Sequence, residues 1–74
     1  MTPTVGRIVH YYPDDSAVKK RMPFAAIVTR VWTDSCVNLE VFNDGGQPDR
    51  GGFAGSVERS DNPEDRHWMW PPRA

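Results

Sequence analysis

Two adjacent stretches of the chain alternate between apolar and polar residues with the period of a β-strand. They are residues 24–33 (FAAIVTRVWT) and 36–43 (CVNLEVFN), and only Asp34 and Ser35 separate them. Successive side chains of a strand point to opposite faces, and a two-residue polar gap fits a tight turn. The pattern therefore predicts an antiparallel hairpin. Its expected core-facing residues are Ala25, Ile27, Thr29 and Val31 in the first strand and Val37, Leu39 and Val41 in the second.

The other face of this hairpin is not wholly polar, because it carries Val28, Trp32 and Phe42. A strand face that water covers usually carries polar side chains. We therefore expect protein or ligand to cover part of this second face as well.

Three more stretches have the composition of short strands. Residues 5–12 (VGRIVHYY) are rich in β-branched and aromatic side chains, 53–59 (FAGSVER) follow a glycine cluster, and 67–70 (HWMW) end at a proline pair. Trp68 and Trp70 share a face of the last strand. We expect both to pack against the hairpin as core, since so short a chain needs that apolar area to fold.

The linking segments differ in character. Residues 13–23 (PDDSAVKKRMP) are polar and bracketed by prolines, which predicts a long loop. Residues 44–52 (DGGQPDRGG) hold four of the six glycines and predict a flexible loop whose amides approach a ligand. In residues 60–66, Asn62, Pro63 and two acids follow the order of a helix start, so one helical or 3₁₀ turn is expected there.

This order of elements predicts the fold. Five short strands, an early loop, a central hairpin and a helical turn before the last strand are typical of an all-β, five-stranded SH3-like barrel. A five-stranded OB-type barrel is the alternative, but it needs longer strands and a helix. Residues 1–74 are expected to form this single domain.

Composition excludes several classes of protein. One cysteine and two histidines make neither an internal disulfide nor a structural zinc site, so no metal or cofactor is expected. No apolar run approaches the roughly 20 residues of a membrane span, which predicts a cytosolic protein. A net charge of −1 argues against binding long nucleic acid.

No enzyme motif is present. Cys36 and His10 are a conceivable nucleophile and base, but nothing in the sequence brings them together, and a lone cysteine is usually a small buried residue. The glycine pairs lack the Gly-Lys-Ser/Thr ending of a P-loop. We therefore expect a protein without catalytic activity.

Aromatic and arginine side chains are the best candidates for binding. Arginine, which outnumbers lysine seven to two, both stacks on rings and binds phosphates. The large rings are too many for so small a barrel to bury completely: Tyr11, Tyr12, Trp32, Phe42, Phe53, Trp68 and Trp70. The first loop and the glycine loop are expected to lie near one another at one end of the barrel. The candidate ligand-binding residues are Arg7, Tyr11, Tyr12, Arg21, Arg30, Trp32, Arg50, Phe53, Ser56 and Arg59.

Two kinds of partner fit these residues. A small anionic ligand would sit between rings and arginines, and an extended peptide of another protein would lie over an aromatic groove. The first thirty residues carry net positive charge and the remainder net negative charge, so copies of the chain could pair head to tail. With the small expected core, this predicts a homo-oligomer.

Four stretches, VGRIVHYY, AAIVTRVW, CVNLEVFNDGG and SVERSDNPEDRHWMWPP, together resemble a family of short proteins encoded by tailed bacteriophages and prophages. The resemblance covers most of the chain except residues 16–22 and 47–52. It implies phage origin and a small SH3-like barrel that acts in the cytoplasm of the host bacterium. Phages encode many proteins of this size that disarm bacterial immunity.

Several such phage proteins are oligomeric sponges, which sequester cyclic nucleotide or cyclic ADP-ribose signals. The resemblance thus favours a non-enzymatic sponge that binds a nucleotide-derived immune signal at or near a subunit interface. The alternative is a protein interaction module that inhibits a host factor or serves in phage assembly.

Overall fold

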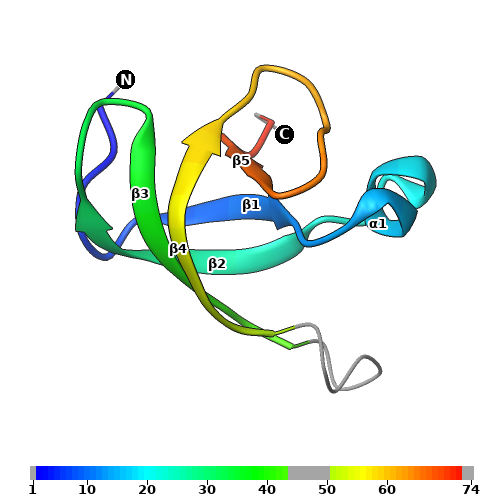
Figure 1. The fold of residues 1–74 in the computed structure, drawn as a ribbon, viewed down its shortest axis with the longest axis horizontal. Helices are drawn as coiled ribbons and strands as arrows, with labels where there is room; N and C mark the ends of the chain where they lie inside the picture. Colours follow the sequence, from blue (N-terminus) through cyan, green and yellow to red (C-terminus); the bar gives the residue numbers. More distant parts are fainter. Residues whose placement is uncertain (1, 44–50, 73–74) are drawn as a thin grey trace.

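Five strands rich in β-branched and aromatic residues close into a barrel in the computed structural model, which describes residues 2–43 and 51–72 (Figure 1). The elements are β1 (Ile8–Tyr12), α1 (Asp15–Lys20), β2 (Phe24–Val31), β3 (Cys36–Val41), β4 (Gly52–Arg59) and β5 (His67–Met69). The strands β1 to β4 pair antiparallel in chain order, and β5 pairs antiparallel with β1 and parallel with β4. The predicted all-β class and small SH3-like barrel are confirmed.

The core lies inside the barrel, and Trp68 of β5 is its largest fully buried side chain. The Trp68 indole N–H donates to the carbonyl of Ser35 in the hairpin turn, at 2.9 Å. Trp70 packs against the core edge-to-face with Trp68, with ring centroids 5.0 Å apart. Trp68 therefore packs as core, as predicted, whereas Trp70 is only partly buried at the edge of the core. The buried core residues are Val9, Tyr11, Phe24, Ala26, Val28, Val37, Leu39, Val41, Val57 and Trp68.

The predicted inner face is right for β3 and wrong for most of β2. Phe24, Ala26 and Val28 point inward, while Ala25 and Thr29 are exposed. Apolar residues occur at both odd and even positions of this strand, so alternation alone does not determine which face points into the core. The register skips Thr29 between the pairs Val28–Leu39 and Arg30–Asn38, and this bulge returns Val31 to the core side.

The predicted loop over residues 13–23 is wrong, because its centre forms the helix α1. Asp14 is the N-cap, and its Oδ1 accepts from the Ala17 N–H at 2.9 Å. Lys19 pairs with Asp15 at 3.1 Å, one turn apart. Ala17 is buried, and Arg21 ends the helix in the left-handed conformation.

The segment between β4 and β5 forms a turn where a helical turn was expected, and the one helix within residues 2–43 and 51–72 lies earlier in the chain. The His67 N–H donates to the Glu64 carbonyl at 3.3 Å, and Arg66 has φ 59°. The Arg66 N–H donates to the Tyr12 carbonyl at 2.7 Å. This left-handed residue turns the chain directly into its pairing with β1.

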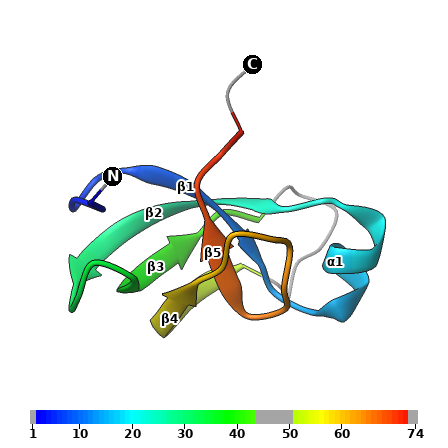
Figure 2. The same ribbon diagram turned by 90° about the horizontal axis from the view of Figure 1, so that it is seen from above.

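The two ends of the chain leave the barrel differently. β1 begins at Ile8, later than the predicted residue 5, because Gly6 turns with φ 93°. The N-terminal segment lies at the end of the molecule opposite α1 (Figures 1 and 2). Beyond β5, the described residues 70–72 run away from the barrel (Figure 2).

Candidate functional site

The outward side of β2, β3 and β4 carries an unusual set of side chains for a surface. The register aligns Ile27, Glu40 and Phe53 in one row across the three strands. In the next row Arg30 lies opposite Asn38, and Trp32 follows the end of β2. We call this surface the outer face; its residues are Ile27, Arg30, Trp32, Asn38, Glu40 and Phe53.

Asn38 holds two irregularities of the sheet together. On its β2 side the register skips Thr29, and on its β4 side Gly55 and Ser56 lie between the pairs Val37–Val57 and Leu39–Ala54. Ser56 has φ 53°, so its N–H leaves the regular ladder and donates instead to Asn38 Oδ1 at 2.8 Å. The same oxygen accepts from Trp32 Nε1 at 2.9 Å.

Arg30 and Trp32 form a stacked pair on this surface. The guanidinium carbon of Arg30 lies 5.1 Å from the Trp32 ring centroid, within cation–π range. Trp32 is 54% exposed. The bond from its indole to Asn38 fixes the ring, so a large aromatic surface stands open to solvent in a fixed orientation.

Phe53 extends the surface onto β4. It is 71% exposed, and its ring lies over Gly55: a Cβ at that glycine would be 2.9 Å from Phe53 Cε2 and 3.7 Å from Asn38 Oδ1. Glycine therefore makes the room for the ring to lie against the strand. Phe53, Asn38 and Trp32 thus form one continuous surface.

Glu40 stands in the middle of the outer face. It is exposed, and its strand neighbours across the sheet are Ile27 and Phe53. Among the described residues it has no salt bridge. The outer face therefore carries one positive and one negative charge among apolar rings.

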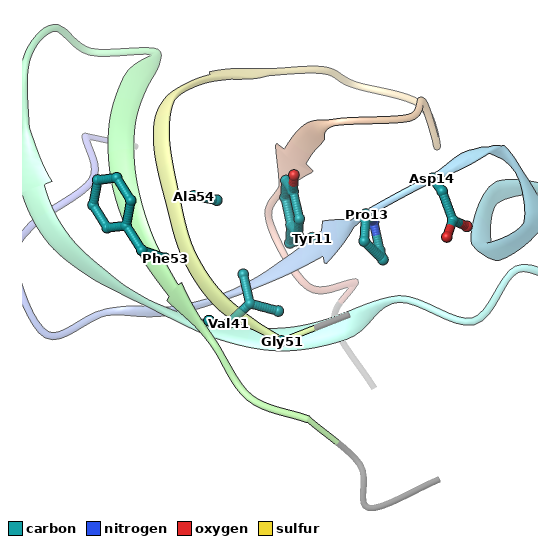
Figure 3. Close-up of a pocket in the computed structure, with 8 residues that line it drawn as sticks. Tyr11, Pro13, Asp14, Val41, Gly51, Phe53 and Ala54 are labelled. Carbon is teal, nitrogen blue, oxygen red and sulfur yellow. The ribbon is translucent and has the colours of Figure 1, made fainter. Parts of the chain in front are cut away.

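A pocket of about 280 Å³ opens at the other side of β4, near the start of α1 (Figure 3). The predicted approach of the first loop to the glycine loop is partly visible here, since Pro13 and Asp14 line it together with Gly51 and Gly52. Ala54 points toward Tyr11, while the Phe53 ring points away (Figure 3). None of the described lining residues is basic.

Tyr11 forms the floor of this pocket. Burial raises the pKa of its hydroxyl above the ordinary value; Arg66 acts in the opposite direction, and Asp14 and Asp65 add to the rise. The phenol therefore stays neutral over an extended alkaline range. A neutral hydroxyl beside a carboxylate suits a neutral or cationic group better than a phosphate.

The structure gathers four of the ten candidate ligand residues, Arg30, Trp32, Phe53 and Ser56, on or beside the outer face. Tyr11 lines the pocket, Tyr12 is buried next to α1, and Arg50 lies outside the described residues. The remaining three candidates are arginines that lie away from both the outer face and the pocket.

These three arginines have other neighbours. Arg7 lies over Trp70 at 5.5 Å. Arg21 caps α1, and the Arg59 Nε lies 4.0 Å from Asp61 Oδ1. The predicted ligand set is therefore not a single site.

The conceivable Cys36–His10 pair is not brought together by the strand register. His10 pairs with Ala25 and Met69, whereas Cys36 pairs with Glu58. Burial, with a smaller effect from the hydrogen bond and charge of Glu58, raises the pKa of the Cys36 thiol. In residues 2–43 and 51–72, no cluster of three or more His, Cys, Asp or Glu side chains could hold a metal ion.

The sequence pattern marks Asn38 and Glu40 only as outward polar residues of a strand, and neither is a candidate for binding on that basis. An available signal is the asparagine itself, because asparagine is depleted in strands. Its place there indicates a side chain with hydrogen bonds to make.

Comparisons with protein-family models, with curated proteins and with solved structures find no match to this chain. The helix that the structure describes is too short to cross a membrane, and no other helix occurs in the described residues.

Proposed function

We propose that this chain is a non-enzymatic binding protein that recognises a protein partner through its outer face. The observation that supports this is the exposed surface of Trp32, Arg30 and Phe53, in which Asn38 holds the Trp32 indole and Arg30 stacks on it. Tryptophan and arginine are the residues that most often dominate binding energy at protein interfaces. Exposed rings in fixed orientations lose little entropy when a partner covers them.

The closed barrel supports side-chain recognition over strand addition. Each of the five described strands pairs with two neighbours, and β5 pairs with β4 at Glu58 and Arg59, which leaves only the part of β4 before Glu58 without a partner on that side. The sheet therefore offers little edge to an extended peptide, whereas the outer face carries exposed apolar area.

The resemblance to short proteins of tailed phages supplies the proposed setting. In that setting the chain acts in the host bacterial cytoplasm, where it inhibits a host factor or takes part in phage assembly. Both roles need a binding surface and no catalysis.

A pull-down from bacterial lysate tests the proposal. The wild-type chain, a Trp32→Ala/Phe53→Ser variant and a Lys20→Ala control serve as baits. Because all three side chains are exposed, the variants keep the fold. We expect one stoichiometric protein, either from the lysate or an untagged copy of the chain added to it, on the wild type and the control, and its loss from the outer-face variant. Retention on that variant would exclude the outer face.

A second candidate function is a sponge for a nucleotide-derived signal, and the stacked Arg30–Trp32 pair favours it. Bases would stack on Phe53 and phosphates would meet Arg30. The Glu40 carboxylate repels phosphates on the same face, and a flat surface encloses a ligand only when a second copy covers it.

Calorimetry with cyclic dinucleotides and cyclic ADP-ribose isomers tests the sponge. Binding heat that Arg30→Ala abolishes supports it, as does a heat-stable small molecule released when the purified protein is denatured. Buffer-level heat for every ligand removes it.

A further inference from the structure

We propose that the partner of the outer face is a second copy of this chain, paired by a two-fold axis that sets Arg30 of each copy against Glu40 of the other. This rests on the proposed function, in that the outer face is taken as the recognition surface. It adds which protein binds the outer face and which ion pairs make that partner specific.

The outer face has opposite charges that are not used within one copy. Arg30 lies against Trp32, and among the described residues neither Arg30 nor Glu40 has a salt bridge. In the strand register the two residues are diagonal neighbours, because Arg30 faces Asn38 and Glu40 lies two residues further along β3. One surface thus carries both halves of an ion pair.

A partner that covers Phe53 and Ile27 must also cover Glu40, which lies between them in the same row. A carboxylate removed from water without a cation opposes binding strongly. The partner must therefore bring a positive charge to that point and a negative charge to Arg30. The same face of a second copy has this charge pattern.

Two-fold symmetry makes the match reciprocal. In an isologous interface, residue i contacts residue j of the other copy and residue j contacts residue i. One axis midway between Arg30 and Glu40 therefore forms both ion pairs at once. The surrounding Trp32 and Phe53 rings, 54% and 71% exposed in the single chain, supply the apolar area.

Charge reversal tests the pairing by sedimentation or light scattering of the purified chain. Arg30→Glu puts two negative charges on the face and Glu40→Arg puts two positive charges there. Each variant alone should be monomeric, with the dimer dissociation constant raised at least about 30-fold. An equimolar mixture should form a heterodimer, because every contact then joins opposite charges.

Two further variants control for loss of folding and for a general effect of charge. Arg30→Glu/Glu40→Arg in one chain restores both contacts and should dimerise, which shows that the single variants are folded and repelled. Lys20→Glu, an equal change of charge on α1, should leave the dimer unaltered.

The pairing is contradicted if the wild-type chain is monomeric at all concentrations. It is also contradicted if the dimer dissociation constant is the same in the wild type, Arg30→Glu and Glu40→Arg. A monomer that still captures a lysate protein through Trp32 and Phe53 also overturns the pairing, but it leaves the proposed function standing. Loss of that capture as well would remove both.

Discussion

Asn38 is a polar residue in the middle of a strand, and its side-chain oxygen serves two donors. Trp32 Nε1 and the Ser56 N–H both reach it, from opposite neighbouring strands. The oxygen therefore compensates the ladder bonds that the bulge in β4 leaves unmade and orients the exposed tryptophan. Binding geometry and local stability depend on the same atom.

Asn38→Ala should lower the free energy of unfolding by about 1–3 kcal/mol, because two hydrogen bonds of about 0.5–1.5 kcal/mol each are lost. Asn38→Asp keeps an oxygen at the same position and should lose less than half as much. Urea unfolding of both variants measures the difference. Equal losses would show that the side-chain oxygen does not hold the bulge.

Tyr11 links stability to alkaline pH. Burial raises its pKa in the folded chain above the ordinary value of a tyrosine, so the folded state holds the proton more tightly than the unfolded state. The contribution to stability is complete below the unfolded pKa and is lost as pH rises through the folded one.

Unfolding free energies measured from neutral pH to above pH 10 should therefore fall in the wild type. In Tyr11→Phe the fall should be smaller, since the titrating group is gone. A titration of tyrosinate absorbance checks the same shift, and an identical decline in both chains would contradict the role of Tyr11.

Single-residue roles were partly predictable from the sequence. Trp32, Arg30 and Phe53 qualify by residue type, and they do lie on one exposed face. Tyr12 qualifies equally by residue type and is buried, and its burial is a tertiary feature that no local pattern encodes. Asn38 gains its importance from two bulges, which no periodicity predicts.

Among the elements, α1 shows how a short helix arises in a polar segment. Its signals are local: an aspartate N-cap, an Asp15–Lys19 pair one turn apart, and two lysines in the last turn. The flanking prolines favour a loop prediction, and six residues are too few for a hydrophobic period to stand out.

Two substitutions at the end of α1 should change the stability of the protein in opposite directions. Arg21 has φ 53°, a conformation that costs most residues energy and glycine little. Arg21→Gly should stabilise the protein by about 0.5–1 kcal/mol. Lys20→Gly, inside the helix, should destabilise it by about 1 kcal/mol. Thermal unfolding of the two variants measures both changes in stability. A change in the same direction for both would contradict the role of Arg21 as the left-handed C-cap.

The strands were the more predictable elements. Their order and the central hairpin follow from composition and turn residues, and β3 shows the expected inner face. The inward face of β2 could not be predicted from the sequence, because apolar residues occur at both odd and even positions of the strand. The bulge at Thr29 also shifts the alternation by one residue. Register irregularities arise from strand pairing, so they become visible only in the assembled sheet.

For the whole molecule, β5 is the element that closes the barrel. Its three residues pair with β1, and two of them, His67 and Trp68, also pair with β4; Trp68 at their centre is 0% exposed. Its indole also bonds to Ser35 in the hairpin turn. One side chain thus joins the last strand to the turn between β2 and β3.

Trp68→Ala should therefore unfold the chain. A buried tryptophan replaced by alanine costs about 3–5 kcal/mol, comparable with the whole stability of about 4–11 kcal/mol expected for this length. Circular dichroism checks this, with Trp32→Ala as the exposed control that stays folded. A cooperative, native-like Trp68→Ala would contradict the closing role of β5.

The most direct test of the outer face as a self-recognition surface is a dilution series followed by nitrogen–proton correlation NMR. The Trp32 indole N–H and the Asn38 side-chain amide are reporters within that face. We expect their signals, with the amides of Ile27, Glu40 and Phe53, to shift as the dimer dissociates, while Gly51 and Tyr11 in the pocket stay unchanged. Unshifted outer-face signals from millimolar to micromolar concentration, or shifts centred on the pocket, would contradict it.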